Sequence, residues 1–155
     1  MANVIDPSTL EGRRGTGYPK PFAEGFAGRL KRALTGPLGL TQFGVNLTTL
    51  EPGAMSALRH WHEKEDEFCY VLEGEITLVS EEGEQILKPG MAVAFPAGEP
   101  NGHHLINRSD RPAVYLEIGT RAADERAHYP GLDLMAVKTG VATVLFTHTD
   151  GTPYD

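Results

Sequence analysis

Between residues 40 and 120 the chain consists of short apolar runs separated by glycine, proline and charged residues. Each run has the length of a β-strand, and no segment between them repeats its apolar residues at a helical interval. Glycine and proline between such runs are typical of tight turns. The pattern therefore predicts an all-β domain, either a sandwich or a barrel. The eight runs cover residues 40–50, 54–62, 67–73, 75–80, 84–87, 91–95, 103–107 and 113–119.

The segment before these runs differs from them in composition and periodicity. The chain has 155 residues, which fits one domain. Residues 1–39 hold many glycines and prolines without a clean periodicity, so we expect an irregular N-terminal arm. Within it, Phe22, Phe26 and Leu30 recur at a helical interval and favour a short helix over about 21–34. This helix is expected to pack on the outside of the barrel or on a partner subunit.

The segment after the runs is expected to be an extension of the same domain. Residues 40–120 form the expected barrel, and residues 121–155 form a C-terminal extension that packs on it. The extension begins with a polar segment, 121–128, for which we expect a helical turn. Two further strands are expected at 134–138 and 141–147, either at a sheet edge or across the barrel.

Composition argues against several classes of function. The formal net charge is −7 and no block of lysine or arginine occurs, so neither nucleic acid nor an anionic membrane is an expected partner. No apolar run reaches the roughly 20 residues that cross a bilayer. The single Cys69 rules out an internal disulfide, and the N-terminus carries no signal-peptide pattern, so we expect a cytoplasmic protein. Neither a Ser-His-Asp arrangement nor a phosphate-binding glycine loop is evident.

The run HWHEKEDEF, residues 60–68, has the spacing of a metal site. Side chains alternate along a strand, so His60 and His62 point the same way and both imidazoles can reach one ion. Glu67 follows His62 at an odd spacing and would lie on the opposite face of an unbroken strand. The charged residues 63–66 are poor strand formers, so we expect the strand to break there and Glu67 to return on a neighbouring strand.

A third imidazole is available from His103 or His104, the only other close pair of histidines. Three neutral imidazoles and one carboxylate leave a divalent ion with a net charge near +1 and open positions for a ligand. Such a site suits an anionic or hydroxyl-bearing small molecule. Imidazole ligands favour zinc, iron, nickel, copper or manganese over calcium and magnesium.

These two regions resemble the paired motifs of the cupin superfamily. The first motif is a glycine, two histidines one residue apart, a glutamate and a closing glycine; the second is a glycine, a Pro-x-Gly turn, a histidine and an asparagine. Two spacings depart from the family pattern, since the loops before His60 and after Gly98 are longer. His103 is preferred to His104 because it lies four residues before Asn107, the family spacing. The matching residues are Gly53, His60, His62, Glu67 and Gly74, then Gly90, Pro96, Gly98, His103 and Asn107.

The resemblance covers roughly residues 40–120 and implies a single double-stranded β-helix, the jelly-roll-like barrel of small bacterial cupins of the cupin 2 conserved barrel type. It also implies a homodimer and one divalent transition metal ion: zinc, iron, manganese or nickel. Some members of this largely uncharacterised subgroup are labelled sugar-phosphate isomerases, which is an analogy because cupin barrels host many chemistries. The implied metal ligands are His60, His62, Glu67 and His103.

The leading functional hypothesis is a metal-dependent enzyme, such as an isomerase or epimerase, that acts on a small oxygen-rich molecule. A sugar, a sugar phosphate or a carboxylic acid fits this description. One alternative is a cupin dioxygenase, which requires a redox-active metal. Others are a non-catalytic small-molecule binding or sensor module, and a scaffold that has lost its metal. Isomerisation needs a base near the metal, and the sequence assigns no catalytic residue.

Several further residues near the motifs are expected to have structural roles. Cys69 shares the parity of Glu67 but is expected to be a small buried hydrophobe. Tyr115 and Glu117 share one face of a strand, for which a solvated face is favoured over a pocket lining. The remaining aromatic and basic residues beside the motifs are expected to pack or to face solvent rather than to bind a substrate anion: Arg59, Trp61, Lys64 and Arg108.

Overall fold

The structure is a computed structural model that describes residues 2–140 and 143–155. Strands dominate it, and no helix in the described part of the chain is long and apolar enough to cross a membrane. The helices are η1 Pro7–Thr9, η2 Lys20–Phe22 and α1 Thr35–Leu38. The strands are β1 Arg13–Arg14, β2 Arg29–Ala33, β3 Phe43–Leu50, β4 Trp61–His62, β5 Glu67–Glu73, β6 Ile76–Ser80, β7 Gly83–Leu87, β8 Ala92–Phe95, β9 His104–Ile106, β10 Ala113–Thr120, β11 Asp124–His128, β12 Met135–Thr139 and β13 Val144–Thr147.

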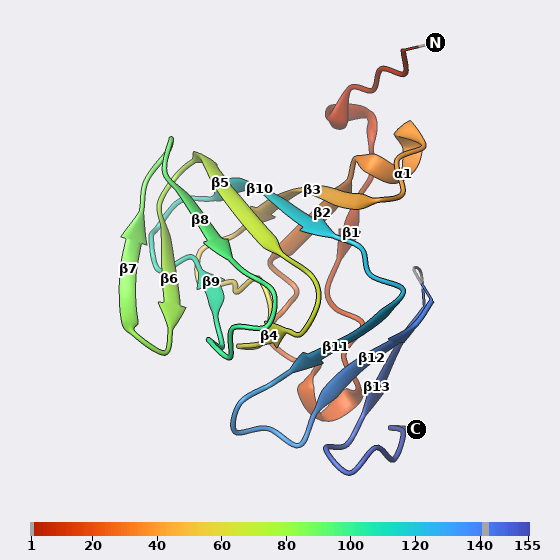
Figure 1. Cartoon of the computed structure of the whole chain (residues 1–155). Coiled ribbons are helices and arrows are strands. Elements are labelled where there is room, and N and C mark those ends of the chain that lie inside the picture. The colour runs from red at the N-terminus through yellow and green to blue at the C-terminus, as the bar shows by residue number, and fades with distance from the viewer. Residues whose placement is uncertain (1, 141–142) are drawn as a thin grey trace.

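Two antiparallel sheets enclose the main hydrophobic core. The larger has the strand order β1-β2-β3-β10-β5-β8 and the smaller has the order β7-β6-β9. Figure 1 shows the smaller sheet beside the β5 and β8 end of the larger one. The core residues come from both sheets and point inward at alternate positions along their strands. This arrangement confirms the all-β barrel expected from the sequence. The core includes Leu50, Val71, Ile76, Leu105 and Tyr115.

The helix expected over 21–34 is wrong. The structure has the short turn η2 followed by β2, which pairs with β3 along its whole length. Gly25 has a φ of +91°, a left-handed conformation that a continuous helix cannot contain. Phe26 is 1% exposed because its ring packs against Tyr18, with centroids 5.4 Å apart. The helical interval of the aromatic residues therefore reflects packing rather than a helix.

The strand expected over 54–62 is mostly absent. Only Trp61–His62 is a regular strand, and His60 forms an isolated antiparallel bridge with His103. The Ser56 hydroxyl accepts the backbone N–H of Leu105, within β9, at 2.9 Å, so a side chain takes the place of a backbone carbonyl. The irregular segment nevertheless holds the first histidine motif beside the second.

The helical turn expected at 121–128 is also wrong, because most of this segment is strand β11. Burial alternates along it: Glu125 and Ala127 are 3% and 4% exposed, whereas the residues beside them are more exposed. An alternation with a period of two is the signature of a strand with one buried face. A glutamate on the buried face conceals that signature in the sequence.

The C-terminal extension builds a sheet that includes part of the first histidine motif. Strand β11 pairs with β12 on one side and with β4 on the other, and β12 pairs with β13. The resulting sheet has the order β13-β12-β11-β4. The strands expected at 134–138 and 141–147 correspond to β12 and β13, except that residues 141–142 lie outside the described residues. The extension therefore positions His62.

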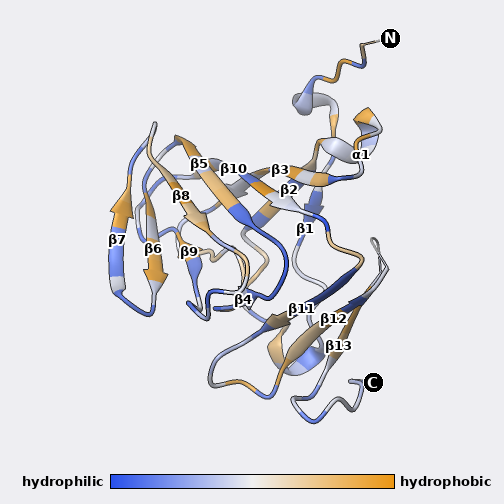
Figure 2. Cartoon of the chain, in the orientation of Figure 1, coloured by the Kyte–Doolittle hydropathy of each residue, from blue (hydrophilic) through white to orange (hydrophobic). Residues whose placement is uncertain are grey.

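The outer face of β5 is apolar. Phe68, Tyr70 and Leu72 are each 38% to 40% exposed, and Figure 2 shows the hydrophobic colour along much of β5 and β8. Large apolar patches on a protein surface often mark interfaces, and two-fold pairing of identical faces is the commonest assembly. The homodimer stays a prediction, and this is the face on which a second copy would pack. The cross-strand neighbours of these residues are Ala92, Ala94, Leu116 and Ile118.

Candidate metal centre

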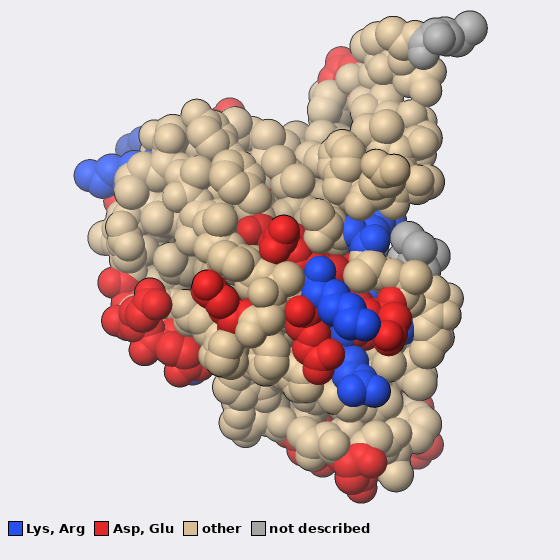
Figure 3. Space-filling view, in the orientation of Figure 1, with Lys and Arg blue, Asp and Glu red and all other residues tan. Residues whose placement is uncertain are grey.

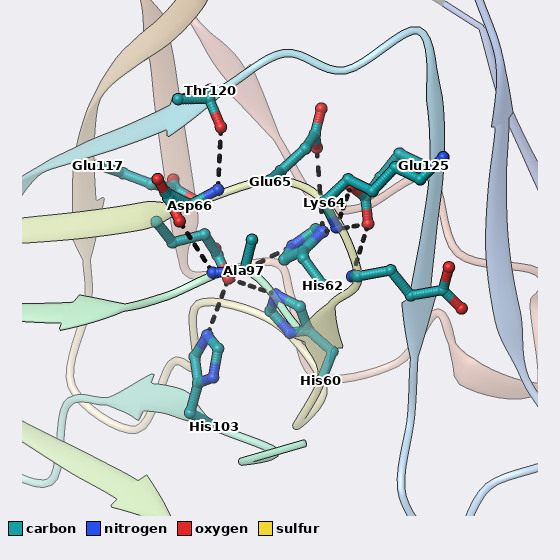
Figure 4. Close-up of polar contacts among 12 residues, drawn as sticks. His60, His62, Lys64, Glu65, Asp66, Ala97, His103, Glu117, Thr120 and Glu125 are labelled. Atoms are coloured by element: carbon teal, nitrogen blue, oxygen red, sulfur yellow. Dashed lines mark hydrogen bonds and ion pairs between the residues drawn. The ribbon is translucent and has the colours of Figure 1, made fainter. Parts of the chain in front are cut away.

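Three histidines converge on one carboxylate oxygen, as Figure 4 shows for the rings of His60, His62 and His103. Oε1 of Glu67 lies 2.9 Å from Nε2 of His103. The same oxygen lies 3.3 Å from Nε2 of His62 and 3.5 Å from Nε2 of His60. Ligand atoms of His60, His62 and Glu67 all lie within 4.8 Å of one another, so this group could hold one metal ion.

Hydrogen bonds to backbone carbonyls determine where two of these rings carry a proton. Nδ1 of His60 lies 2.7 Å from the carbonyl oxygen of Leu58. Nδ1 of His103 lies 2.9 Å from the carbonyl oxygen of Asn101. A carbonyl oxygen only accepts, so each Nδ1 donates, and in the neutral ring Nε2 then carries the lone pair. Both lone pairs face the negatively charged Glu67, which is unfavourable unless a proton or a cation lies between them. This donor set fits a cation.

His62 has acidic partners behind its ring. Its Nδ1 is buried and forms no hydrogen bond within the described residues, with Glu125 Oε1 at 3.6 Å and Glu65 Oε1 at 3.9 Å. The two oxygens of Glu125 accept the backbone N–H groups of Glu63 and Lys64, each at 2.9 Å. Carboxylates behind an imidazole are the outer partners that orient histidine ligands of metals.

The connection between β4 and β5 explains how His62 and Glu67 meet. The first strand ends at His62, and the chain resumes at Glu67 in a different sheet, which confirms the break expected from their odd spacing. The Thr120 hydroxyl accepts the backbone N–H of Asp66 at 2.9 Å. The carboxylate of Asp66 accepts the N–H of Ala97 at 2.8 Å. These bonds anchor the connection, so the carboxylate of Glu67 returns toward the histidines.

His103, rather than His104, faces the centre. The ring of Phe95 stacks on that of His103, with centroids 3.4 Å apart and planes within 1° of parallel. Phe95 lies directly opposite Glu67 in the pairing of β5 with β8, so the stacked ring is beside the carboxylate. His104 instead directs its Nδ1 to the carbonyl oxygen of Ala57 at 2.8 Å.

Burial and charge shift the pKa values of this group in opposite directions. Burial lowers the pKa of His60, but the adjacent Glu67 carboxylate outweighs it and the net shift is upward. Burial raises the pKa of Glu67, yet the neighbouring His60 and His103 hold it well below its usual range. For His62 burial is the larger influence, and its pKa is lowered.

The pH dependence of stability tests the pairing of His60 with Glu67 in chelator-treated protein. The pKa of His60 is raised, so its contribution is fully present below the unfolded value of about 6.5 and is lost as the pH rises through the folded value. The pKa of Glu67 is lowered, so its contribution is present above about 4.5 and is lost as the pH falls through the folded value.

We therefore expect urea denaturation to show a larger loss of unfolding free energy for His60→Gln at about pH 5.5 than at about pH 8.5. His60 is a smaller influence than burial on the lowered pKa of His62, so most of that shift is common to the two proteins. A loss that is equal at the two pH values, or larger at the alkaline one, would contradict the pairing.

The candidate centre opens into a cavity of about 420 Å³. This volume lies within the range of small-molecule sites. The aromatic rings of Tyr18, Tyr129 and Phe146 form part of its wall. Figure 3 shows acidic and basic side chains gathered around the junction of the barrel and the C-terminal sheet. The charged residues that line the cavity are Arg13, Arg29, Lys31, Glu65, Glu67, Glu117, Glu125 and Lys138.

The solvated face expected for Tyr115 and Glu117 is wrong. Tyr115 is 1% exposed, because this face of β10 is the inside of the barrel. Glu117 lines the cavity, and its Oε2 lies 3.2 Å from Nζ of Lys31. Cys69 is buried in the core, as expected, and burial raises the pKa of its thiol well above the usual value. A thiol in this state remains protonated and is a poor nucleophile.

The basic residues beside the motifs form ion pairs at the surface. Each basic residue pairs with a carboxylate of the protein, and none of these basic residues lines the cavity. Trp61 stacks on His128, with ring centroids 4.5 Å apart, which agrees with the packing role expected of it. The pairs are Arg59 with Glu81, Lys64 with Asp124 at 2.8 Å, and Arg108 with Glu84 at 2.6 Å.

Sequence analysis missed the charged residues that the two flanking segments contribute to the cavity. Arg29 and Lys31 come from the segment expected to be a helix, and Glu125 from the segment expected to be a helical turn. A period of two was present in both segments, since Arg29 and Lys31 flank Leu30, and Glu125 precedes Ala127 by two positions. That alternation was the available signal for a strand.

Comparison with known proteins supports the architecture. The Cupin domain family matches residues 46–119. A crystal structure of a sugar phosphate isomerase from a cupin superfamily, from Silicibacter pomeroyi, is 44% identical over 99% of this chain and 97% of that one, with a TM-score of 0.92. A protein from Acidithiobacillus ferrooxidans, described provisionally as a sugar phosphate isomerase, is 25% identical over 96% of this chain and 91% of that one, with a TM-score of 0.79. No curated protein matches the chain.

Proposed function

This chain belongs to the cupin superfamily, and we propose that within it the chain is a metal-dependent isomerase of a sugar phosphate. In this proposal one divalent ion of zinc, iron, manganese or nickel is held by His60, His62, Glu67 and His103. The observation that carries it is the convergence of three imidazole Nε2 atoms on Oε1 of Glu67. The similarity to a sugar phosphate isomerase along nearly the whole chain supports the choice of reaction.

A bound divalent ion supplies a Lewis acid that polarises a carbonyl or hydroxyl oxygen of the substrate. The protein's own residues do the rest. Glu125 and Glu65 lie behind His62, at 3.6 and 3.9 Å from its Nδ1, in the position from which carboxylates orient histidine ligands. The aromatic walls of the cavity, Tyr18 and Tyr129 among them, reduce the access of water to the reacting atoms.

Isomerisation of a sugar moves a proton between neighbouring carbons and so requires a base, a role that we assign to Glu117. Glu117 lies opposite Cys69 in the pairing of β10 with β5, and Glu67 is two residues farther along β5 on the same face. Diagonal neighbours of this kind are roughly 7 to 8 Å apart, a distance that a small substrate spans. Lys31, at 3.2 Å, holds the Glu117 carboxylate in place.

Solvent exchange tests this assignment. Zinc-loaded protein is incubated in D₂O with a panel of aldose and ketose phosphates, and proton NMR follows deuterium incorporation beside the carbonyl. We expect at least one substrate to exchange, and Glu117→Gln to slow that exchange by at least about 100-fold, because removal of a general base costs roughly that factor or more. The metal content of the variant should equal that of the wild-type protein.

Glu84→Gln is the matched control, since Glu84 is an exposed carboxylate that pairs with Arg108 away from the cavity. It should leave the exchange rate unchanged. Oxygen consumption by iron-loaded protein, without proton exchange in any metal form, would replace the isomerase proposal with a dioxygenase. Ligand binding with neither reaction would indicate a binding module.

A further inference from the structure

Arg29 is a buried cation in the wall of the cavity. Its side chain lines the cavity on β2, and the residue is 8% exposed. Within the described part of the chain it forms no ion pair. Its two terminal nitrogens donate to the backbone carbonyls of Ser56 and Gly15, and its Nε is buried without a hydrogen-bond partner among the described residues. The ring of Phe26, 5.3 Å from the guanidinium carbon, supplies only a partial balance.

Burying a charge is unfavourable unless an opposite charge accompanies it. The two carbonyl bonds tether the arm and the loop after β3, but hydrogen bonds to carbonyl oxygens do not in themselves require a positive charge. A guanidinium adds a positive charge and a third donor, the Nε–H group, which has no acceptor among the described residues. Both properties are explained if an anionic ligand group completes the site.

Two further cations surround this position. Arg13 on β1 lies directly opposite Lys31 on β2, and both side chains line the cavity. Gly17 leaves room for the Arg13 guanidinium, since a Cβ at Gly17 would lie 3.3 Å from Nη2 of Arg13. Arg13 forms no ion pair among the described residues, whereas Lys31 contacts Glu117.

Other charged groups of the cavity have partners within the protein. Nζ of Lys138 lies 2.6 Å from Oε2 of Glu65. The Glu125 carboxylate accepts two backbone N–H groups. The cavity cations that form no ion pair with a described residue are therefore Arg13 and Arg29, on β1 and β2, which lie across the six-stranded sheet from the β5 strand that carries Glu67.

We propose that Arg29 and Arg13, assisted by Lys31, form a binding subsite for an oxyanion group of the substrate, a phosphate or a carboxylate. The substrate then spans the cavity, with its anion at the β1–β2 edge and its reacting carbons between Glu117 and the histidines. This inference deepens the proposed function and rests on it for the identity of the ligand, but the subsite can be measured without metal or turnover.

The test is isothermal titration of the chelator-treated, full-length protein with inorganic phosphate, and separately with acetate, at constant ionic strength maintained with chloride. We expect binding of at least one of the two anions to be at least about tenfold weaker in Arg13→Gln, because one charge-assisted contact is lost. Arg14→Gln is the matched control. It removes the same charge from the next residue of β1, which does not line the cavity, and should bind as the wild-type protein does.

Arg29→Gln should abolish binding, but it also disturbs two structural tethers, so the Arg13 and Arg14 pair decides the outcome. Tighter binding of phosphate than of acetate assigns the subsite to a phosphate ester, and the reverse order assigns it to a carboxylate. Equal weakening in Arg13→Gln and Arg14→Gln, or no binding of either anion by the wild-type protein, would overturn the subsite. The proposed function is tested separately, by metal content and proton exchange. Failure of the anion subsite is therefore distinguishable from failure of the proposed function.

Discussion

Replacement of both His60 and Glu67 by alanine is expected to lower the bound transition metal from about one equivalent per chain to less than about a tenth. Glu67 lies at the point where the three imidazoles converge, and His60 is oriented by the carbonyl of Leu58. Removal of both leaves His62 and His103 without the carboxylate between them, and two imidazoles bind a divalent ion weakly. Elemental analysis of protein purified without chelator or affinity-metal resin measures the difference.

The adjacent pair His103 and His104 provides the matched control. His103→Ala should lose most of the metal, because its Nε2 contacts Glu67 at 2.9 Å. His104→Ala should keep it, because His104 is held by the carbonyl of Ala57 and faces away from the centre. Metal loss in His104→Ala alone would identify His104, rather than His103, as the third imidazole ligand. An unchanged metal content in the double variant, or none in the wild-type protein after reconstitution, would refute the site.

Asn107→Ala is expected to lower the free energy of unfolding by roughly 3 to 5 kcal/mol, with a fall in Tm on the order of 10 °C. Asn107 is 0% exposed. Its amide nitrogen donates to the carbonyls of Leu50 and Arg111 at 2.8 and 2.6 Å. Its amide oxygen accepts the backbone N–H of Ser109 at 2.9 Å and the Ser109 hydroxyl at 2.7 Å. The alanine variant removes the donor to the buried carbonyl of Leu50 and the acceptor of the half-buried Ser109 N–H, and each such loss costs about 1 to 3 kcal/mol. Urea denaturation followed by circular dichroism measures the loss.

Two variants separate the amide network from a simple change of side-chain volume. Asn107→Asp keeps an oxygen for Ser109 but turns a second oxygen, with its charge, toward two carbonyls, so it should be at least as destabilising as alanine. Asn101→Ala removes a partly exposed amide that accepts one backbone N–H at 3.0 Å and should cost less than about 1 kcal/mol. Comparable losses at the two asparagines would contradict the role assigned to Asn107.

The barrel strands and the four converging residues were predictable because their signals are local. The run over 67–73 coincides with β5, since apolar and polar residues there follow the pleat of one strand between two turns. The odd spacing of His62 and Glu67 predicted a break that the structure contains. Family resemblance then selected His103 as the third imidazole, and the structure directs that ring to Glu67.

The cavity walls were not predictable because their residues oppose the ordinary burial pattern. Arg29 and Glu125 are charged yet 8% and 3% exposed. Each is stabilised by backbone groups from distant segments, such as the carbonyls of Gly15 and Ser56 for the arginine. Such partners depend on how β2 and β11 pair in space, and a hydrophobic pattern contains no information about them. Tyr115 was misjudged for the same reason, since its strand has polar residues on its inner face.

The pairing of β4 with β11 has a consequence for the order in which the molecule is made. A growing polypeptide folds from its N-terminus, and His62 leaves the ribosome long before Ala127, its partner across the two strands. Until β11 emerges, β4 has no neighbour in its sheet and Glu125 cannot fix the turn that brings Glu67 back. We therefore expect the nascent barrel to be unable to retain an ion, so that metal loading is one of the last events in the biogenesis of this protein.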